Sequence, residues 1–212
     1  MFSPRSKSNA SVPVVEQLES RRLYNGSATL VGTTLTVQGT SGNDTIVMGY
    51  NASGYYFVTI NNQPAQLFGP GVFTAIVISG GQGNDYIDVS GLPAGTPGVE
   101  IHGGQGDDTL IGSVNDDTIY GGAGNDSIGG GAGDDWIAGG AGSNTLRGGA
   151  GNDTITAGAG SNLINGGPGD DTIYADNGFP DSIYGGTGNN TAYVDPNNID
   201  LVVNATAIPP TS

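Results

Sequence analysis

A nine-residue repeat runs from Gly103 to Tyr193 and constrains the fold more than any other feature of the sequence. Its rows follow the pattern G-G-x-G-x-D-x-U-x, where U is Leu or Ile in all but the last copy. Ten rows follow one another in phase, and only one of them, residues 175–184, has a tenth residue. A fixed short period of this kind predicts a repeat architecture in which each row is one structural unit.

The composition argues against an ordinary globular core. Glycine accounts for 40 of the 212 residues, and only 35% of the residues are hydrophobic. Residues 1–22 hold four bases and two acids, so the net charge of −15 leaves −17 for the rest of the chain, whose only base is Arg147. This charge repels nucleic acid and anionic membranes, and it opposes compaction unless a cation neutralises it. A disordered acidic tail would not place Leu or Ile at every ninth residue.

Several kinds of site and segment are missing from the sequence. The chain has no cysteine and a single histidine, His102, which argues against disulfides and against a zinc site. No run of 18 apolar residues occurs, so we expect no membrane span.

The residues of one row predict a calcium-binding loop followed by a short strand. Glycines at positions 1, 2 and 4 permit positive φ and a tight curve that turns backbone carbonyls inward. The aspartate at position 6 adds a carboxylate, and six or more such oxygens at about 2.3–2.6 Å suit Ca²⁺ better than Mg²⁺. Positions 7 to 9 are expected to form a strand whose position 8 points inward, so that two sheets face each other. The position-8 residues are Leu110, Ile119, Ile128, Ile137, Leu146, Ile155, Ile164, Ile173, Ile183 and Ala192.

These rows resemble the calcium-binding nonapeptides of the RTX (repeats-in-toxin, haemolysin-type) family. The resemblance implies an all-β fold, a parallel β-roll or β-solenoid, in which two rows form one coil and row n stacks on row n+2. Calcium would then lie between stacked loops in two columns. The position-6 residues of one column are Asp108, Asp126, Asn144, Asn162 and Asp181, and those of the other are Asp117, Asp135, Asp153, Asp171 and Asn190.

We therefore expect several Ca²⁺ ions held by position-6 carboxylates. The expected metal ligands are Asp108, Asp117, Asp126, Asp135, Asp153, Asp171 and Asp181, with Asp85 from an earlier copy of the row. Strong sites are expected between Asp117 and Asp135, Asp135 and Asp153, Asp153 and Asp171, and Asp108 and Asp126. Sites flanked by Asn144 and Asn162 should be weaker, because a carboxamide carries no charge. The acids at position 5 (Asp107, Asp116, Asp134 and Asp170) are expected to be solvated.

Two details bear on these sites. Asn115 replaces the glycine at position 4 of its row, and asparagine tolerates a left-handed backbone, so we expect that loop to survive. Aspartates in turns often only cap a backbone N–H, but capping does not explain glycine at three positions of the row.

The repeat array is expected to be flanked by a leader and two capping regions. Residues 1–26 are predicted to be a disordered leader or targeting segment, and residues 27–102 an N-terminal β-hairpin cap with degenerate rows at 39–47 and 80–88. Strands are predicted from the β patterns of residues 29–38, 55–60 and 72–79. Residues 103–193 form the roll, and residues 194–212 supply a capping strand at 199–203 and a tail. Terminal units depart from the consensus because they close off the core.

The leader bears on location. It lacks the apolar stretch of an ordinary signal peptide, but residues 18–23, LESRRL, resemble the LEPR-type motif of bacterial surface proteins, with Ser20 in place of proline. A basic leader without a targeting role could contain the same six residues by chance. We expect an extracellular or bacterial cell-surface protein, where roughly millimolar calcium drives folding by mass action.

Two other classes of function compete with structural calcium binding. The sequence contains neither HExxH nor GxSxG, and a glycosidase-like pair of Asp88 and Glu100 has no supporting spacing, so we expect no enzyme; a carbohydrate-active enzyme on a β-solenoid is the weaker alternative. Ice binding would need a repeated outward Thr in the loops, whereas position 3 is mostly Ala. A calcium-dependent adhesion module with a cell-surface or matrix partner stays open. Outward aromatic residues such as Trp136 would suit a sugar, but packing on a flat sheet explains them as well.

Overall fold

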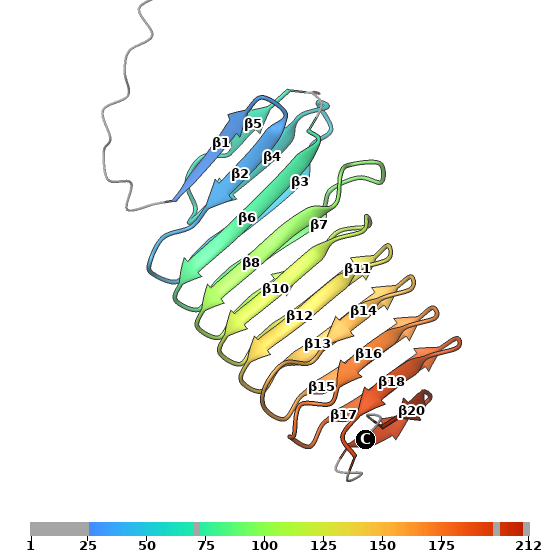
Figure 1. The fold of residues 1–212 in the computed structure, drawn as a ribbon. Coiled ribbons are helices and arrows are strands. Elements are labelled where there is room, and N and C mark those ends of the chain that lie inside the picture. Colours follow the sequence, from blue (N-terminus) through green and yellow to red (C-terminus); the bar gives the residue numbers. More distant parts are fainter. Residues whose placement is uncertain (1–25, 70–72, 197–199, 210–212) are drawn as a thin grey trace, which may run out of the picture.

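Two long β-sheets lie face to face and form a flattened solenoid (Figure 1). The computed structural model describes residues 26–69, 73–196 and 200–209, and every regular element within these ranges is a strand. The predicted leader, with its LEPR-like residues 18–23, lies outside the described residues apart from Gly26. The all-β solenoid predicted from the repeat is confirmed.

Each sheet contains ten strands. The front sheet of Figure 1 contains, in spatial order, β1 (Ser27–Val31), β2 (Thr34–Gln38), β6 (Ala75–Gln82), β8 (Val99–Gln105), β10 (Thr118–Ala123), β12 (Trp136–Ala141), β14 (Thr154–Thr156), β16 (Thr172–Ala175), β18 (Thr191–Val194) and β20 (Thr206–Ile208). The rear sheet contains β5 (Gln66–Phe68), β4 (Tyr56–Ile60), β3 (Thr45–Tyr50), β7 (Tyr86–Gly91), β9 (Thr109–Ile111), β11 (Ser127–Ala132), β13 (Thr145–Ala150), β15 (Leu163–Pro168), β17 (Ser182–Thr187) and β19 (Leu201–Val203).

The strands of the roll are parallel and keep a register of two rows. Ile119 in β10 lies opposite Ile137 in β12, which is 18 residues further along the chain. At the ten-residue row the step becomes 19, so that Ile164 lies opposite Ile183. Each row therefore stacks on the row after next, as the family resemblance implied. Many strands run on from position 7 to position 3 of the following row, because the backbones at positions 1 to 3 continue the pairing.

The core is one layer of aliphatic side chains between the sheets. All ten predicted position-8 residues are buried, none more than 1% exposed. Strand alternation sends their neighbours at positions 7 and 9 outward, and the burial pattern of β14, intermediate–buried–intermediate, is typical. The position-8 prediction is confirmed throughout the array.

The N-terminal cap ends both sheets with antiparallel strands. Residues 29–38 fall into two strands, β1 and β2, which form a hairpin that turns at Gly32. On the rear sheet, β3, β4 and β5 form an antiparallel meander. The strand predicted from residue 72 begins at Ala75, and residue 72 lies outside the described residues. The N-terminal end of the roll therefore has antiparallel strand pairs, whereas the strands of the repeat array pair in parallel.

The C-terminal end has one strand on each sheet. The single strand predicted for residues 199–203 is found as β19, Leu201–Val203, which pairs with β17 of the rear sheet; residue 199 is not described. A second strand, β20, pairs with β18 of the front sheet. Both sheets therefore end at the same level.

Aromatic side chains on the outer face of the front sheet pack on one another. The ring centroids of His102 and Tyr120 are 4.7 Å apart and nearly parallel, and Trp136 lies 5.0 Å from Tyr120. Tyr174 and Tyr193 form a second stacked pair at 4.9 Å. Because the rings cover each other's faces, packing on the sheet accounts for their positions.

The described part of the chain contains no helix of the length and hydropathy needed to cross a membrane.

Candidate metal centre

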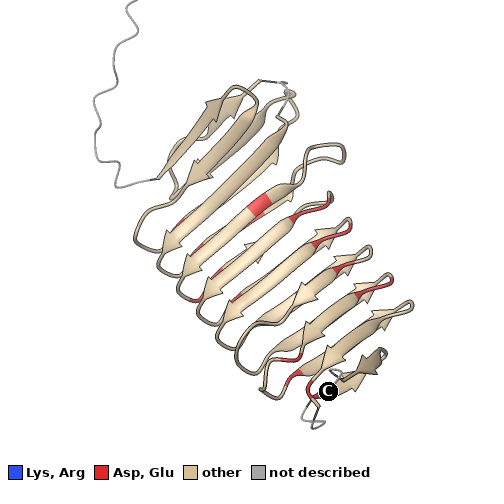
Figure 2. Ribbon diagram, viewed as in Figure 1, with Lys and Arg blue, Asp and Glu red and all other residues tan. Residues whose placement is uncertain are grey.

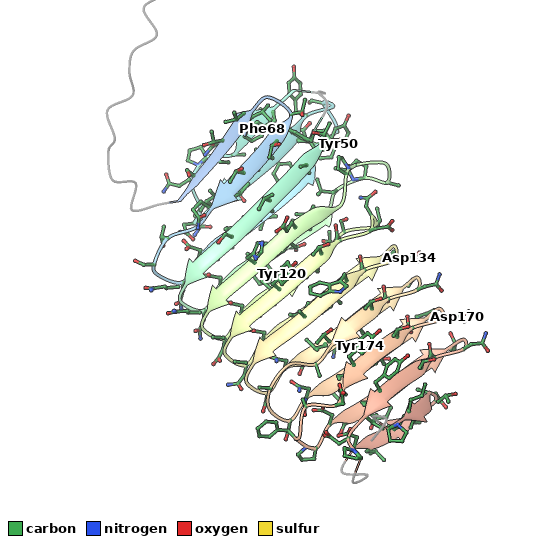
Figure 3. The ribbon with its side chains drawn as sticks, in the orientation of Figure 1. Tyr50, Phe68, Tyr120, Asp134, Asp170 and Tyr174 are labelled. Carbon is green, nitrogen blue, oxygen red and sulfur yellow. The ribbon has the colours of Figure 1, made fainter. Side chains whose placement is uncertain are left out.

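The loops between the sheets form two edges of the roll, and these edges carry most of the acidic residues (Figure 2). We call the loops that lead from the front sheet to the rear sheet the first edge. The loops that return from the rear sheet to the front sheet are the second edge, which carries Asp134 and Asp170 (Figure 3). The position-6 residues of the first edge are Asp44, Asp85, Asp108, Asp126, Asn144, Asn162 and Asp181, and those of the second edge are Asp117, Asp135, Asp153, Asp171 and Asn190.

The glycines of a row have two different roles. At positions 2 and 4, Gly122 and Gly124 have φ of 113° and 138°, which side chains rarely adopt. At position 1, Gly121 does not have a positive φ; a Cβ there would instead overlap the Asp126 Oδ2 atom and the Gly139 carbonyl oxygen. The prediction of positive φ at all three positions was therefore wrong for position 1, where glycine is required for space.

A ladder of hydrogen bonds runs through the position-6 side chains. The backbone N–H of Asp117 donates to Oδ1 of Asp135 at 2.8 Å, and that of Asp135 donates to Oδ1 of Asp153 at 2.9 Å. On the first edge, the N–H of Asp108 donates to Oδ1 of Asp126 at 2.9 Å. Each bond joins a row to the row after next, so Oδ1 has a structural role that needs no metal.

The second carboxylate oxygen, Oδ2, has no such hydrogen bond in six of these aspartates. Six buried Oδ2 atoms have no hydrogen-bond partner among the described residues, and they belong to Asp85, Asp108, Asp126, Asp135, Asp153 and Asp171. Their residues are at most 2% exposed. Leaving a buried acceptor unpaired costs about 1–3 kcal/mol, and more when it is charged. Such a pattern, repeated six times, is suited to a bound cation.

Each of these oxygens lies beside a backbone carbonyl that belongs to the next stacked row. At Gly130, the Asp135 Oδ2 atom and the Gly148 carbonyl oxygen both lie where a Cβ atom would have to fit. The carbonyls of Gly131 and Gly133 also point toward the next stacked row, residues 148–156, since Cβ atoms at Gly149 and Gly151 would overlap them. Several acceptors, among them an Oδ2 atom without a donor, therefore face one interval between two loops. A hard cation with oxygen ligands fits this donor set.

Burial makes the ionised form of these carboxylates unfavourable. Burial, as the largest cause, raises the pKa of Asp85, Asp108, Asp126 and Asp153 from 3.8 to about 6, although a backbone N–H opposes the shift in each case. Burial and the neighbouring carboxylates of Asp117 and Asp153 raise the pKa of Asp135 to about 8. The pKa of Asp171 is also raised, mainly by burial. Without a cation, each of these sites disfavours its own charge.

Two of the eight predicted ligands have both carboxylate oxygens bonded by the protein itself. Oδ2 of Asp117 accepts the backbone N–H of Ser113 at 2.6 Å. Oδ2 of Asp181 accepts the side-chain amide of Asn177 at 2.9 Å. The sequence signals for these differences are a serine in place of glycine at position 2 and the ten-residue length of the later row.

The loop that contains Asn115 survives, but not through a left-handed asparagine. Asn115 has no positive φ. Its side chain instead donates to the Pro93 carbonyl and to Ser113 Oγ, both at 3.2 Å, and accepts the N–H of Gly95 at 2.9 Å. The Pro/Gly-rich interruption before the main array therefore packs on this loop and fixes it.

The acids at position 5 are exposed, yet they are not merely solvated. Oδ1 of Asp107 accepts the backbone N–H of Asn125 at 2.7 Å, and Oδ1 of Asp134 accepts that of Asn152 at 2.7 Å. In these bonds the position-5 side chain of the earlier row accepts an N–H of the next stacked row. At position 6 the direction is reversed, because the side chain of the later row accepts an N–H of the earlier row. Adjacent coils are thus joined in both directions.

The pair considered for catalysis does not come together. Asp88 lies on β7 of the rear sheet and bonds to Ser90, whereas Glu100 lies on β8 of the front sheet and bonds to His102 at 2.7 Å. No group of three or more His, Cys, Asp or Glu side chains converges as a metal site within the described ranges. A cation between these loops would therefore need ligands other than side-chain carboxylates, and the backbone carbonyls described above are available to it.

Comparison with known families agrees with this geometry. The family model of the RTX calcium-binding nonapeptide repeat matches residues 36–47, 77–91, 102–137, 129–164, 147–180 and 176–196, which together make up more than half of the chain. No curated protein matches the chain. The chain belongs to the family of proteins with RTX calcium-binding nonapeptide repeats, which bind several Ca²⁺ ions in a β-roll.

Proposed function

We propose that this chain is a structural calcium-binding module of a secreted or cell-surface bacterial protein, and that calcium drives its folding outside the cell. The observation that carries the proposal is the set of six buried Oδ2 atoms without a donor. A roll with six such atoms is costly to form in the absence of a cation, and bound calcium removes that cost.

We assign three sites to each edge. On the first edge the carboxylates are those of Asp85, Asp108 and Asp126, and on the second edge they are those of Asp135, Asp153 and Asp171. Each is paired with the position-1 carbonyl of the next stacked row: Gly103, Gly121, Gly139, Gly148, Gly166 and Gly185, respectively. Calcium supplies positive charge to these oxygens, and the glycine loops hold them in place.

The charge of the chain supports folding on export. Beyond residue 22 the net charge is −17, because only Arg147 offsets the acids, and this charge opposes a compact state. A ligand that binds the folded roll and hardly binds the unfolded chain stabilises folding by mass action. Extracellular calcium-binding modules have Kd values of about 10⁻⁴–10⁻³ M, so roughly millimolar calcium outside the cell suffices and cytosolic calcium does not.

Circular dichroism in the far ultraviolet tests this function. The full chain is recorded in EDTA and then titrated with CaCl₂ and, separately, with MgCl₂. We expect a cooperative gain of β signal with calcium and little gain with magnesium, which keeps its waters and demands octahedral geometry. A β spectrum that is already complete in EDTA at neutral pH would contradict calcium-driven folding.

Catalysis has no support of this kind, since Asp88 and Glu100 lie on different sheets. Adhesion to a cell-surface or matrix partner stays a prediction, and its partner would have to bind the outer faces or the edges of the roll.

A further inference from the structure

The ten-residue row, residues 175–184, contains a side chain that no other row has in this place. Asn177 Nδ2 donates to the carbonyl oxygen of Gly158 at 2.7 Å and to Oδ2 of Asp181 at 2.9 Å, with the Gly160 carbonyl oxygen at 3.5 Å. The two carbonyls belong to positions 2 and 4 of row 157–165, on which this row stacks. The carboxylate is the position-6 side chain of row 175–184 itself. One amide thus contacts the kinds of oxygen that elsewhere surround the unpaired Oδ2 atoms.

The orientation of this amide is fixed by its other end. Asn177 Oδ1 accepts the backbone N–H of Phe179 at 2.7 Å, so Nδ2 faces the interval between the rows. In the regular rows the carbonyls at positions 2 and 4 face glycines of the next stacked row. Row 175–184 has no glycine at positions 1 to 3, and its extra residue leaves room for the asparagine side chain.

The neighbouring Asn162 completes the same interval. Its Nδ2 donates to the Gly160 carbonyl oxygen at 2.7 Å and to Oδ1 of Asp181 at 3.0 Å. Every carboxylate oxygen of Asp181 therefore has a donor, in contrast to Asp171, whose Oδ2 has none. Asn162 also stands where the regular rows have aspartate, so this interval has one negative charge fewer.

We propose that the Asn177 amide takes the place of a calcium ion between rows 157–165 and 175–184, and that Asp181 is not a metal ligand. This inference rests on the proposed function, because it concerns which intervals of a calcium-binding roll hold no metal. An NH₂ group has two N–H donors, enough for one carbonyl and one carboxylate oxygen in an interval that has lost a charge. The C-terminal end of the roll is thus closed by an internal donor, and Asn177→Asp would turn the interval into a metal site.

Counting the calcium ions bound by the full chain tests the proposal. Native mass spectrometry and calorimetric titration with CaCl₂ are carried out on the wild-type chain and four variants: Asp181→Asn, Asp171→Asn, Asn177→Asp and Ser161→Asp. We expect Asp181→Asn to bind as many ions as the wild type and Asp171→Asn to bind one fewer. Asn177→Asp should bind one more, because two carboxylates would then face the Gly158 and Gly160 carbonyls.

The remaining variant controls for added charge. Ser161 is an exposed position-5 residue of row 157–165, so Ser161→Asp adds a carboxylate at the solvent-exposed side of the same loop, away from the buried position-6 side chains, and the count should not change. A loss of one ion in Asp181→Asn would overturn the proposal, and this variant decides it even where Asn177→Asp fails to fold. A wild-type chain that binds no calcium would instead overturn the proposed function itself.

Discussion

Midway along the roll, the two edges share the same bond between stacked rows but differ in one atom of the position-6 side chain. On the second edge, Asp135 and Asp153 are joined by an N–H to Oδ1 bond of 2.9 Å, and on the first edge Asn144 and Asn162 are joined by an equivalent bond of 2.8 Å. The aspartates add a second oxygen without a partner, whereas the asparagines add an amide nitrogen that can donate. The stacking of rows and the demand for calcium are therefore separate properties.

The largest effect is expected from removing a carboxylate of the second edge. Asp135→Ala or Asp153→Ala deletes both the ladder bond and a charged oxygen of the site. Hydrogen bonds to charged groups contribute about 1.5–3 kcal/mol, so the equilibrium constant for calcium-driven folding should fall roughly ten- to hundredfold. The matched variant is Asn144→Ala, which deletes a ladder bond but no carboxylate and should have the smaller effect. Equal shifts in a calcium titration followed by circular dichroism would refute the difference between the edges.

Protons should act as partial substitutes for calcium. The pKa values of Asp85, Asp108, Asp126 and Asp153, about 6 in the folded chain, exceed the ordinary 3.8, and that of Asp135 reaches about 8. The folded state thus binds more protons than the unfolded state, and these groups favour the metal-free fold at low pH. Their contribution is lost as the pH rises through 6 and, for Asp135, through 8.

In EDTA, the β signal at pH 4.5 should therefore exceed that at pH 7.5, and saturating calcium should remove the difference. A metal-free chain with no more β structure at pH 4.5 than at pH 7.5 would contradict this view of the buried carboxylates.

A smaller gain is expected from adding a carboxylate to the first edge. In Asn144→Asp the new Oδ2 would lie beside the carbonyl oxygen of Ala157, as in the regular sites, and the calcium midpoint for folding should fall. Asn162→Asp should lower it less, because the Asn177 amide already fills that interval. If both variants lowered the midpoint equally, Asn177 would not be a substitute for the cation.

The smallest effect on calcium binding is expected at Asp117. Its Oδ2 already accepts the Ser113 N–H, so Asp117→Asn should leave the number of bound ions unchanged, whereas Asp135→Asn should lose one. Mass spectrometry of the two variants under identical calcium makes the comparison. Loss of an ion from Asp117→Asn would restore the strong site predicted between Asp117 and Asp135.

The repeat pattern was sufficient to predict the fold, because its period specifies which residues face inward. Ile155 and Ile173 are buried as predicted, and their strands pair in the predicted order. The pattern could not reveal which carboxylates lack a donor. The decisive donors are a backbone N–H at Ser113 and an amide at Asn177, and their orientations depend on how each loop adapts to a lost glycine or an added residue. Departures from the consensus mark these places, but only the folded loops show what occupies them.

The 18-residue register has a consequence for the length of such a roll. Deleting residues 121–138 removes one complete coil, and every remaining row keeps its sheet, its edge and its type of neighbour. Deleting residues 121–129 alone would send each following row to the opposite side, so that Asn144 would stack on Asp117 and strands would change sheets. Rows of this protein should therefore be gained or lost in pairs, and a single-row change should be tolerated far less well than a change twice as large.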